Sequence, residues 1–214
     1  MEKTIEAHDF VALKKQVAIL NRTYTSVNDR SVRNVVVADV VAKVRELLPE
    51  NDDTEHFLAV IQAPTLTKAQ AERELARLRE YVTPFPMVSS AQLAKLFKKV
   101  KKLPEPNWDM IDRYESSYLG WDDHGSQRKY LVAPHAGKLV GVYGEFDSKP
   151  LNGLCAICHQ LGTVSMFLSK VKARGADGNY TKRGNLICRD SFSCNAQLSE
   201  LEYLDRFIET TLVQ

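Results

Sequence analysis

The sequence lacks the features of a membrane or exported protein. It contains no run of about 18 apolar residues, the length that a transmembrane helix needs. Residues 1–6 (MEKTIE) carry charges, and no apolar segment with a small-residue cleavage site follows, so the sequence predicts no signal peptide. We therefore expect a cytoplasmic protein with no membrane partner, in a compartment that keeps thiols reduced.

Catalytic motifs are also absent. There is no G-x-S-x-G nucleophile elbow, no phosphate-cradling glycine loop and no H-E-x-x-H metal motif, and the carboxylates are scattered along the chain. The formal net charge of +2 is too small to indicate a nucleic-acid binder by itself. The 214 residues suffice for one large or two small domains. These observations predict a binding protein rather than an enzyme.

Cysteine is scarce, and all of it lies near the C-terminus. The four cysteines form two close pairs, Cys155-x2-Cys158 and Cys188-x5-Cys194. Two such pairs suit one tetrahedral zinc ion held by four thiolates, which leave no open coordination position for a substrate. Two disulfides, redox pairs and haem attachment at the C-x-x-C-H sequence are the alternatives. We expect His159 to be a neighbour of the metal site rather than a ligand.

The residues around the cysteines predict a treble clef. The first pair suits a tight knuckle whose backbone N–H groups face the sulfurs. Residues 163–170 alternate like a strand, 176–179 have turn composition and 180–187 form the returning strand. The second pair suits the first turn of a helix, whose positive end favours thiolate. Knuckle, hairpin and helix in this order are the parts of that zinc finger.

The rest of the chain predicts an α+β protein of two domains. Residues 1–83 show four helical segments joined by short connections, which indicates an N-terminal four-helix bundle. One of these segments is rich in β-branched residues, but its length and spacing favour a helix. Its predicted buried stripe comprises Val32, Val36, Val40, Val44 and Leu47 or Leu48. Pro84 and Pro86 mark a boundary, and residues 84–214 form an α/β domain with the treble clef at about 150–214.

Two further segments of the second domain are informative. Ser89 and Ser90 can cap a helix with Leu93 and Phe97 inward, and five lysines between residues 95 and 102 outward, as a solvated face. Residues 118–121, 129–133 and 138–146 have the alternation of antiparallel strands.

The chain resembles the FusB-type fusidic acid resistance proteins and their relatives, which bind elongation factor G (EF-G). The resemblance runs through most of the chain and is strongest in the segment ICRDSxxCN at 187–195. The other matching segments are VTPFP at 82–86, LFKKVKK at 96–102, GW at 120–121, RKY at 128–130, VYGE at 142–145 and DGNYTKRG at 177–184.

The resemblance implies a function and a set of site residues. It implies that the protein binds the C-terminal domains of EF-G, including EF-G on ribosomes, and releases drug-trapped EF-G without chemistry on the drug. It implies one structural Zn²⁺ ion held by Cys155, Cys158, Cys188 and Cys194. The implied partner-binding residues include Arg183 and Phe207, with Leu154 and Leu186 at positions where relatives can carry aromatic residues. Tyr180 and Lys182 on the returning strand complete the predicted partner-binding set.

Two alternatives stay open from the residues themselves. Phe207 lies in a stripe with Leu204 and Ile208 and suits a core position as well as an interface. The positive charge of residues 165–190 suits an acidic protein surface, but it also suits rRNA phosphates. A zinc-finger rRNA- or ribosome-binding protein without EF-G specificity is therefore the alternative function.

Overall fold

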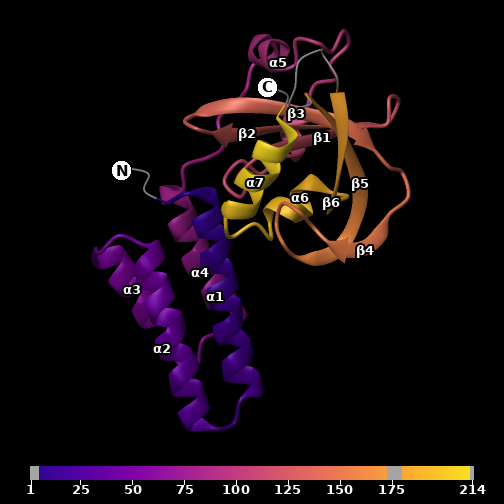
Figure 1. Cartoon of the computed structure of the whole chain (residues 1–214). Coiled ribbons are helices and arrows are strands. Elements are labelled where there is room, and N and C mark those ends of the chain that lie inside the picture. The colour runs from indigo at the N-terminus through magenta and orange to yellow at the C-terminus, as the bar shows by residue number, and fades with distance from the viewer. Residues whose placement is uncertain (1–4, 173–179, 213–214) are drawn as a thin grey trace. The chain divides into compact units, whose positions relative to one another are not determined.

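The computed structural model describes residues 5–172 and 180–212, and the chain forms two compact units (Figure 1). The first unit spans Met1–Pro84 and the second Phe85–Gln214. Within the described residues, no helix is both long and apolar enough to cross a bilayer.

The first unit consists of helices with well-defined N-terminal caps. The Asp29 side chain accepts hydrogen bonds from the N–H groups of the next helix, Asn51 caps the following one, and Thr67 forms a capping box with Gln70. The helices are α1 (Ala7–Ser26), α2 (Arg30–Leu47), α3 (Asp52–Ile61) and α4 (Lys68–Leu78), followed by the short 3-10 helix η1 (Arg79–Tyr81). The predicted helical bundle is confirmed, including the helical state of the β-branched segment α2.

The buried stripe predicted for α2 is wrong in its first turns. Val40 and Val44 are fully buried, but Val32 is 49% exposed and Val36 is only half-buried. Helix α2 has 18 residues, whereas α3 and α4 have 10 and 11. Both buried residues of α2 lie in its C-terminal half, where Arg45 pairs with Glu55 of α3, so the periodicity of the sequence continues beyond the core.

The second unit is built on one six-stranded antiparallel sheet with a short helix before it and two after it. The order of the paired strands is β1-β2-β3-β5-β4, and β6 pairs with β5. The strands are β1 (Leu119–Asp123), β2 (Arg128–His135), β3 (Lys138–Phe146), β4 (Leu151–Leu154), β5 (Leu161–Lys172) and β6 (Tyr180–Cys188). The helices are α5 (Ser90–Leu96), the 3-10 helix η2 (Trp108–Met110), α6 (Ser191–Asn195) and α7 (Glu202–Thr211).

Side chains from the two faces of strands β1–β3 enter two different cores. On one face, Trp121, Tyr130 and Tyr143 lie on neighbouring strands with ring centroids 5.4 and 5.8 Å apart. Phe97, which directly follows α5, meets all three rings edge-on at 5.5–6.2 Å. Gly141 allows this approach, since a Cβ there would lie 2.9 Å from the Phe97 ring. The residues on the other face join the metal-side core described below.

Strand β4 and the turn predicted at 176–179 are two elements that the sequence analysis and the described structure do not share. The sequence analysis did not predict β4, whose four residues include Asn152 and Gly153. The predicted hairpin turn at 176–179 lies outside the described residues. The remaining predicted strands are present, and the mixed helix and sheet fold is confirmed.

Candidate metal centre

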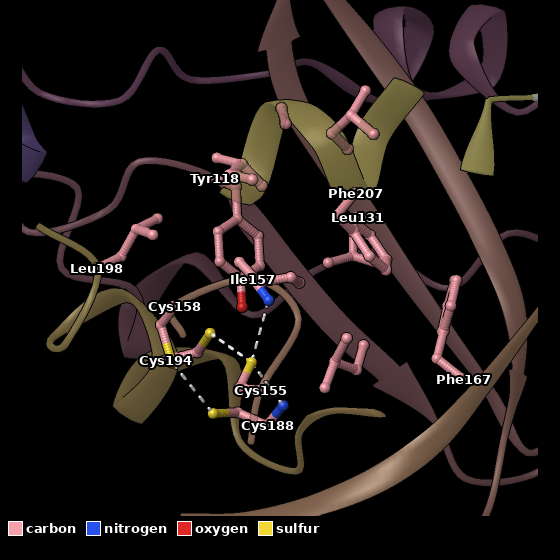
Figure 2. Close-up of a cluster of buried hydrophobic side chains, with 14 of the residues drawn as sticks. Tyr118, Leu131, Cys155, Ile157, Cys158, Phe167, Cys188, Cys194, Leu198 and Phe207 are labelled. Carbon is pink, nitrogen blue, oxygen red and sulfur yellow. Dashed lines mark hydrogen bonds between the residues drawn. The ribbon is translucent and has the colours of Figure 1, made fainter. Parts of the chain in front are cut away.

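The four cysteines form one buried cluster. Cys155 and Cys158 lie in the knuckle between β4 and β5, Cys188 ends β6 and Cys194 lies in α6. Their sulfur atoms all lie within 4.8 Å of one another (Figure 2). Asp190 caps α6 by accepting from the N–H groups of Phe192 and Ser193, which fixes the helix that carries Cys194.

The sulfur geometry fits one tetrahedral zinc ion. The Sγ atoms of Cys155 and Cys194 are 3.8 Å apart, and those of Cys158 and Cys188 are 3.6 Å apart. A tetrahedron with Zn–S bonds of about 2.3 Å has S···S edges of about 3.8 Å. A disulfide needs a bond of about 2.05 Å, and all four thiols are free. The close sulfur contacts also join the first pair of cysteines to the second, so the two pairs form a single site.

Backbone N–H groups support the Cys155 sulfur as the sequence predicted. The N–H of Ile157 donates to Cys155 Sγ at 3.3 Å, and that of Cys188 donates to the same sulfur at 3.2 Å. The knuckle is also joined to β6, since Ala156 N–H donates to the Leu186 carbonyl at 2.8 Å. These donors favour a thiolate at Cys155.

The four sulfurs lie close enough to shift one another's pKa. Hydrogen bonds from Cys158, Cys188 and Cys194 hold the pKa of Cys155 far below its ordinary value. Hydrogen bonding to Cys155 in turn raises the pKa of Cys188 and Cys194. Four thiols that share one site suit a divalent cation, which stabilises all four as thiolates together.

Tyr118 is a neutral neighbour of this cluster. Its side chain is 1% exposed, and burial together with the nearby Cys194 sulfur holds the pKa of its hydroxyl well above the usual range. In Figure 2 its ring lies directly beside the cysteine cluster. The phenol therefore stays protonated next to Cys194, where a donor is compatible with a metal-bound thiolate.

Asn195 connects the metal site to the start of strand β1. Its Oδ1 accepts from the N–H groups of Ser117 at 2.8 Å and Tyr118 at 3.3 Å. Its Nδ2 donates to the carbonyls of Tyr118 at 3.0 Å and Ser191 at 3.1 Å. One buried amide thus satisfies backbone groups on two segments that are far apart in the sequence. The sequence analysis did not assign this role.

A buried lysine fixes the chain next to Cys188. Lys129 on β2 is 1% exposed and donates to Asp122 Oδ1 at 2.8 Å and to the Arg189 carbonyl at 3.1 Å. Its Nζ also lies 4.8 Å from the centre of the Phe146 ring, and the Arg189 guanidinium lies 5.2 Å from the same ring. Each cation therefore has a partner, which is the condition for burying charge.

His159 contacts the last helix and is not a metal ligand. Its ring stacks on Tyr203 of α7 with centroids 3.8 Å apart and planes 5° apart. Its backbone has φ of +53°, a left-handed conformation that is uncommon for a residue with a side chain. The expected position of His159 as a neighbour of the site agrees with this geometry.

Phe207 lies in the metal-side core. The side chain is 2% exposed, and its ring centroid lies 5.6 Å from that of Phe167 on β5. Of the two roles that the sequence left open for Phe207, the core role is the one that the structure shows. In this structure the ring offers no surface to a partner.

Leu154 belongs to an exposed apolar pair. It is 44% exposed and pairs across the β4–β5 ladder with Leu161, which is 80% exposed. The sequence analysis did not single out Leu161, because its partner strand β4 was not predicted. Leu186 is half-buried and pairs with Met166 instead.

The predicted basic residues lie elsewhere on the hairpin. Arg183 is exposed and pairs with Ser169 of β5, whereas Lys182 is exposed and lies 3.2 Å from Glu145 Oε2. The side chain of Tyr180 lies outside the described part of the chain. Along β5, the partners of Leu154 and Arg183 are Leu161, the first residue of the strand, and Ser169, near its other end. A single partner must span this length to contact both.

Comparison with known proteins identifies the family. A family model for the N-terminal domain of elongation factor G-binding proteins matches residues 4–86, and one for the FBP C-terminal treble-clef zinc finger matches residues 89–211. A search of curated proteins gave no match. A solved structure described as the fusidic acid resistance protein FusC is 38% identical, covers 98% of both chains and has a TM-score of 0.89.

Together with the clustered thiols, the treble-clef match indicates one structural zinc ion. The predicted resemblance is confirmed: the chain belongs to the elongation factor G-binding protein family, which carries this C-terminal treble-clef zinc finger.

Proposed function

We propose that this protein binds EF-G and promotes its release from ribosomes on which fusidic acid has trapped it. The observation that carries the proposal is the whole-length similarity to the fusidic acid resistance protein FusC, at 38% identity and with 98% of each chain covered. The protein acts in the cytoplasm, on free EF-G and on ribosome-bound EF-G complexes. Its effect is to protect translation from the drug.

We propose that it acts by binding and not by catalysis. Four thiolates complete the coordination of zinc, so no position remains for a water molecule or substrate. The cluster is buried, and Tyr118 beside it stays neutral. The metal therefore holds α6 and the knuckle in place as a rigid support for the binding surface.

The proposed contact surface lies on strands β4 to β6. Leu154 and Leu161 form an exposed apolar pair directly before and after the metal-bound knuckle. Exposed leucines on a rigid support suit the apolar centre of an interface. Arg183, exposed on β6, can make a bidentate contact with a partner carboxylate. Phe207 supports this surface from within the core.

Substitutions at exposed positions test the proposal without disturbing the core. We expect Leu161→Asp and Arg183→Glu each to weaken EF-G binding about tenfold or more, measured by isothermal titration calorimetry. Thermal melts should stay unchanged because both side chains are exposed. Met110→Asp is the matched control, because Met110 is 74% exposed in the same unit and lines a hollow that includes no described residue of β4–β6.

A second measurement addresses release. Ribosomes carrying EF-G and fusidic acid are pelleted with and without the protein, and the wild-type chain should move EF-G into the supernatant. Leu161→Asp should do so less effectively, and Met110→Asp as well as wild type. If Leu161→Asp releases EF-G as well as the wild type and the Met110→Asp control do, the proposed surface is wrong. Retention of purified rRNA without EF-G, with a steep loss at higher salt, would favour the rRNA-binding function instead.

A further inference from the structure

A second candidate site lies where strands β3 and β5 separate. The two strands pair only at Glu145–Leu168 and Phe146–Phe167, and they diverge from there. The space between them forms a cavity of about 570 Å³, bounded by β3, β5, the end of α5 and Thr211. Figure 1 shows β3 and β5 running in different directions across the second unit. This cavity contains neither the cysteines nor the Leu154–Leu161 pair.

A glycine at the branch point keeps the strands close there. A Cβ on Gly144 would lie 2.5 Å from the carbonyl oxygen of Leu168, a distance that real side chains do not show. Strands β3 and β5 are therefore held together at Gly144 and Leu168, and the cavity opens where they separate beyond this contact.

The walls of the cavity include unpaired strand edges. Residues 138–145 of β3 pair with β2 on one side, and within the described residues those before Glu145 have no strand partner on the other side. Residues 169–172 of β5 pair with β6 and likewise lack a described partner strand on the cavity side. An unpaired edge presents N–H and C=O groups that can pair with an added strand.

The cavity is strongly cationic. Lys95, Lys98, Lys99, Arg128 and Lys170 line it, and Glu145 is the only carboxylate among the described lining residues. That carboxylate already lies 3.2 Å from the amine of Lys182. Lys95 and Lys98 stand on the α5 side of the opening, whereas Lys170 stands on β5. Among the described lining residues cations outnumber carboxylates, and they come from both the α5 end and β5, so a ligand here meets positive charge from two elements.

The apolar floor favours a peptide over a nucleic acid. Leu96 and Leu168, both half-buried, contribute aliphatic surface. The aromatic rings are not free for stacking: Phe97 is 2% exposed, and Tyr143 stacks on Tyr130 with the Arg128 guanidinium 6.0 Å from its centre. Binding of single-stranded RNA relies on aromatic faces that bases can stack on. Such a face is missing from the described lining.

We propose that this cavity binds an extended acidic peptide segment of a partner protein, which adds as a strand to the free edge of β3. Its backbone pairs with residues 138–144, its carboxylates contact Lys95, Lys98 and Lys170, and its apolar side chains lie on Leu96 and Leu168. The lining of this cavity does not include Leu154, Leu161 or Arg183, and its test uses no EF-G, so the two proposals can fail independently.

The probe is a fluorescent peptide of alternating Glu and Val, of about eight residues, the length that the β3 edge can pair. It is titrated into the full-length protein and followed by fluorescence anisotropy. We expect saturable binding that weakens as salt increases. Lys95→Glu/Lys98→Glu should weaken binding about tenfold, since two favourable charge contacts become repulsive. Lys170→Glu tests the contribution of strand β5 to peptide binding independently.

Lys101→Glu/Lys102→Glu is the matched control, because these exposed lysines follow the same helix but do not line the cavity. Hydrogen exchange adds a backbone measurement: bound peptide should slow exchange of amides in residues 138–144. The proposal is overturned if the peptide does not bind, if the control loses as much affinity or if these amides show no added protection. It is also overturned if oligouridylate binds with the same dependence on Lys95 and Lys98, because the site then belongs to RNA.

Discussion

Replacing Asn195 with alanine tests how strongly the metal site is tied to the sheet. The Asn195 side chain is 5% exposed and makes four hydrogen bonds, of which three reach backbone groups of Ser117 and Tyr118. Those two residues precede β1, so no strand ladder supplies alternative partners. The fourth bond goes to the Ser191 carbonyl inside α6.

The expected magnitude follows from the groups left without partners. Each buried donor or acceptor that loses its partner costs about 1–3 kcal/mol. Three such groups, partly relieved by local movement, lower the free energy of unfolding by about 3–5 kcal/mol. This is large compared with the net stability of a typical domain, about 5–15 kcal/mol.

The assay uses a natural reporter. Both tryptophans, Trp108 and Trp121, lie in the second unit, so urea unfolding followed by tryptophan fluorescence reports on that unit alone. Zinc is kept at a fixed free concentration, because ligand binding shifts apparent stability. Asn152→Ala is the control: this asparagine is exposed on β4, and its replacement should change stability by less than about 0.5 kcal/mol. A loss below about 1 kcal/mol for Asn195→Ala would refute the reasoning.

Two further predictions concern the core and the metal. Phe207→Ala should lower the free energy of unfolding by about 3–5 kcal/mol in the same assay, because a buried ring is removed from its contact with Phe167. EF-G affinity of the folded variant should stay near wild type, and lost affinity with unchanged stability would instead place the ring at an interface. Cys188→Ser should abolish stoichiometric zinc binding and unfold the second unit, since metal binding supplies much of its folding free energy. Metal analysis that finds one zinc per chain in this variant would contradict the proposed ligand set.

Local signals in the sequence were sufficient for most helices and strands. Capping boxes are present at Thr67–Gln70 and Ser89–Gln92, where the sequence indicates the starts of helices. They could be found in the sequence because they depend only on residues three positions apart. The length of α2 outweighed its β-branched composition. The cysteine pairs predicted the metal site because their spacing reflects the local geometry of a knuckle and a helix end.

Features that depend on distant packing could not be predicted in this way. The exposure of Val32 depends on how far the 10-residue helix α3 extends along the 18-residue helix α2. The exposed pair that Leu161 forms with Leu154 depends on β4, a strand of four residues with weak strand propensity. The role of Asn195 depends on a partner segment 77 and 78 positions away. Helical periodicity alone also left both a core role and an interface role open for Phe207.

The stack between His159 and Tyr203 gives the metal site a direct link to the C-terminal helix. His159 immediately follows the ligand Cys158, and its ring lies flat against Tyr203 of α7, with centroids 3.8 Å apart. Arg206, one turn further along α7, lies 5.8 Å from the centre of the Tyr203 ring. A displacement of α7 by a bound protein would therefore act directly on the residue next to Cys158, in addition to its contact with the sheet through Phe207 and Phe167. The metal in this finger would then respond to events on the last helix, and a spectroscopic metal substituted for zinc could report them.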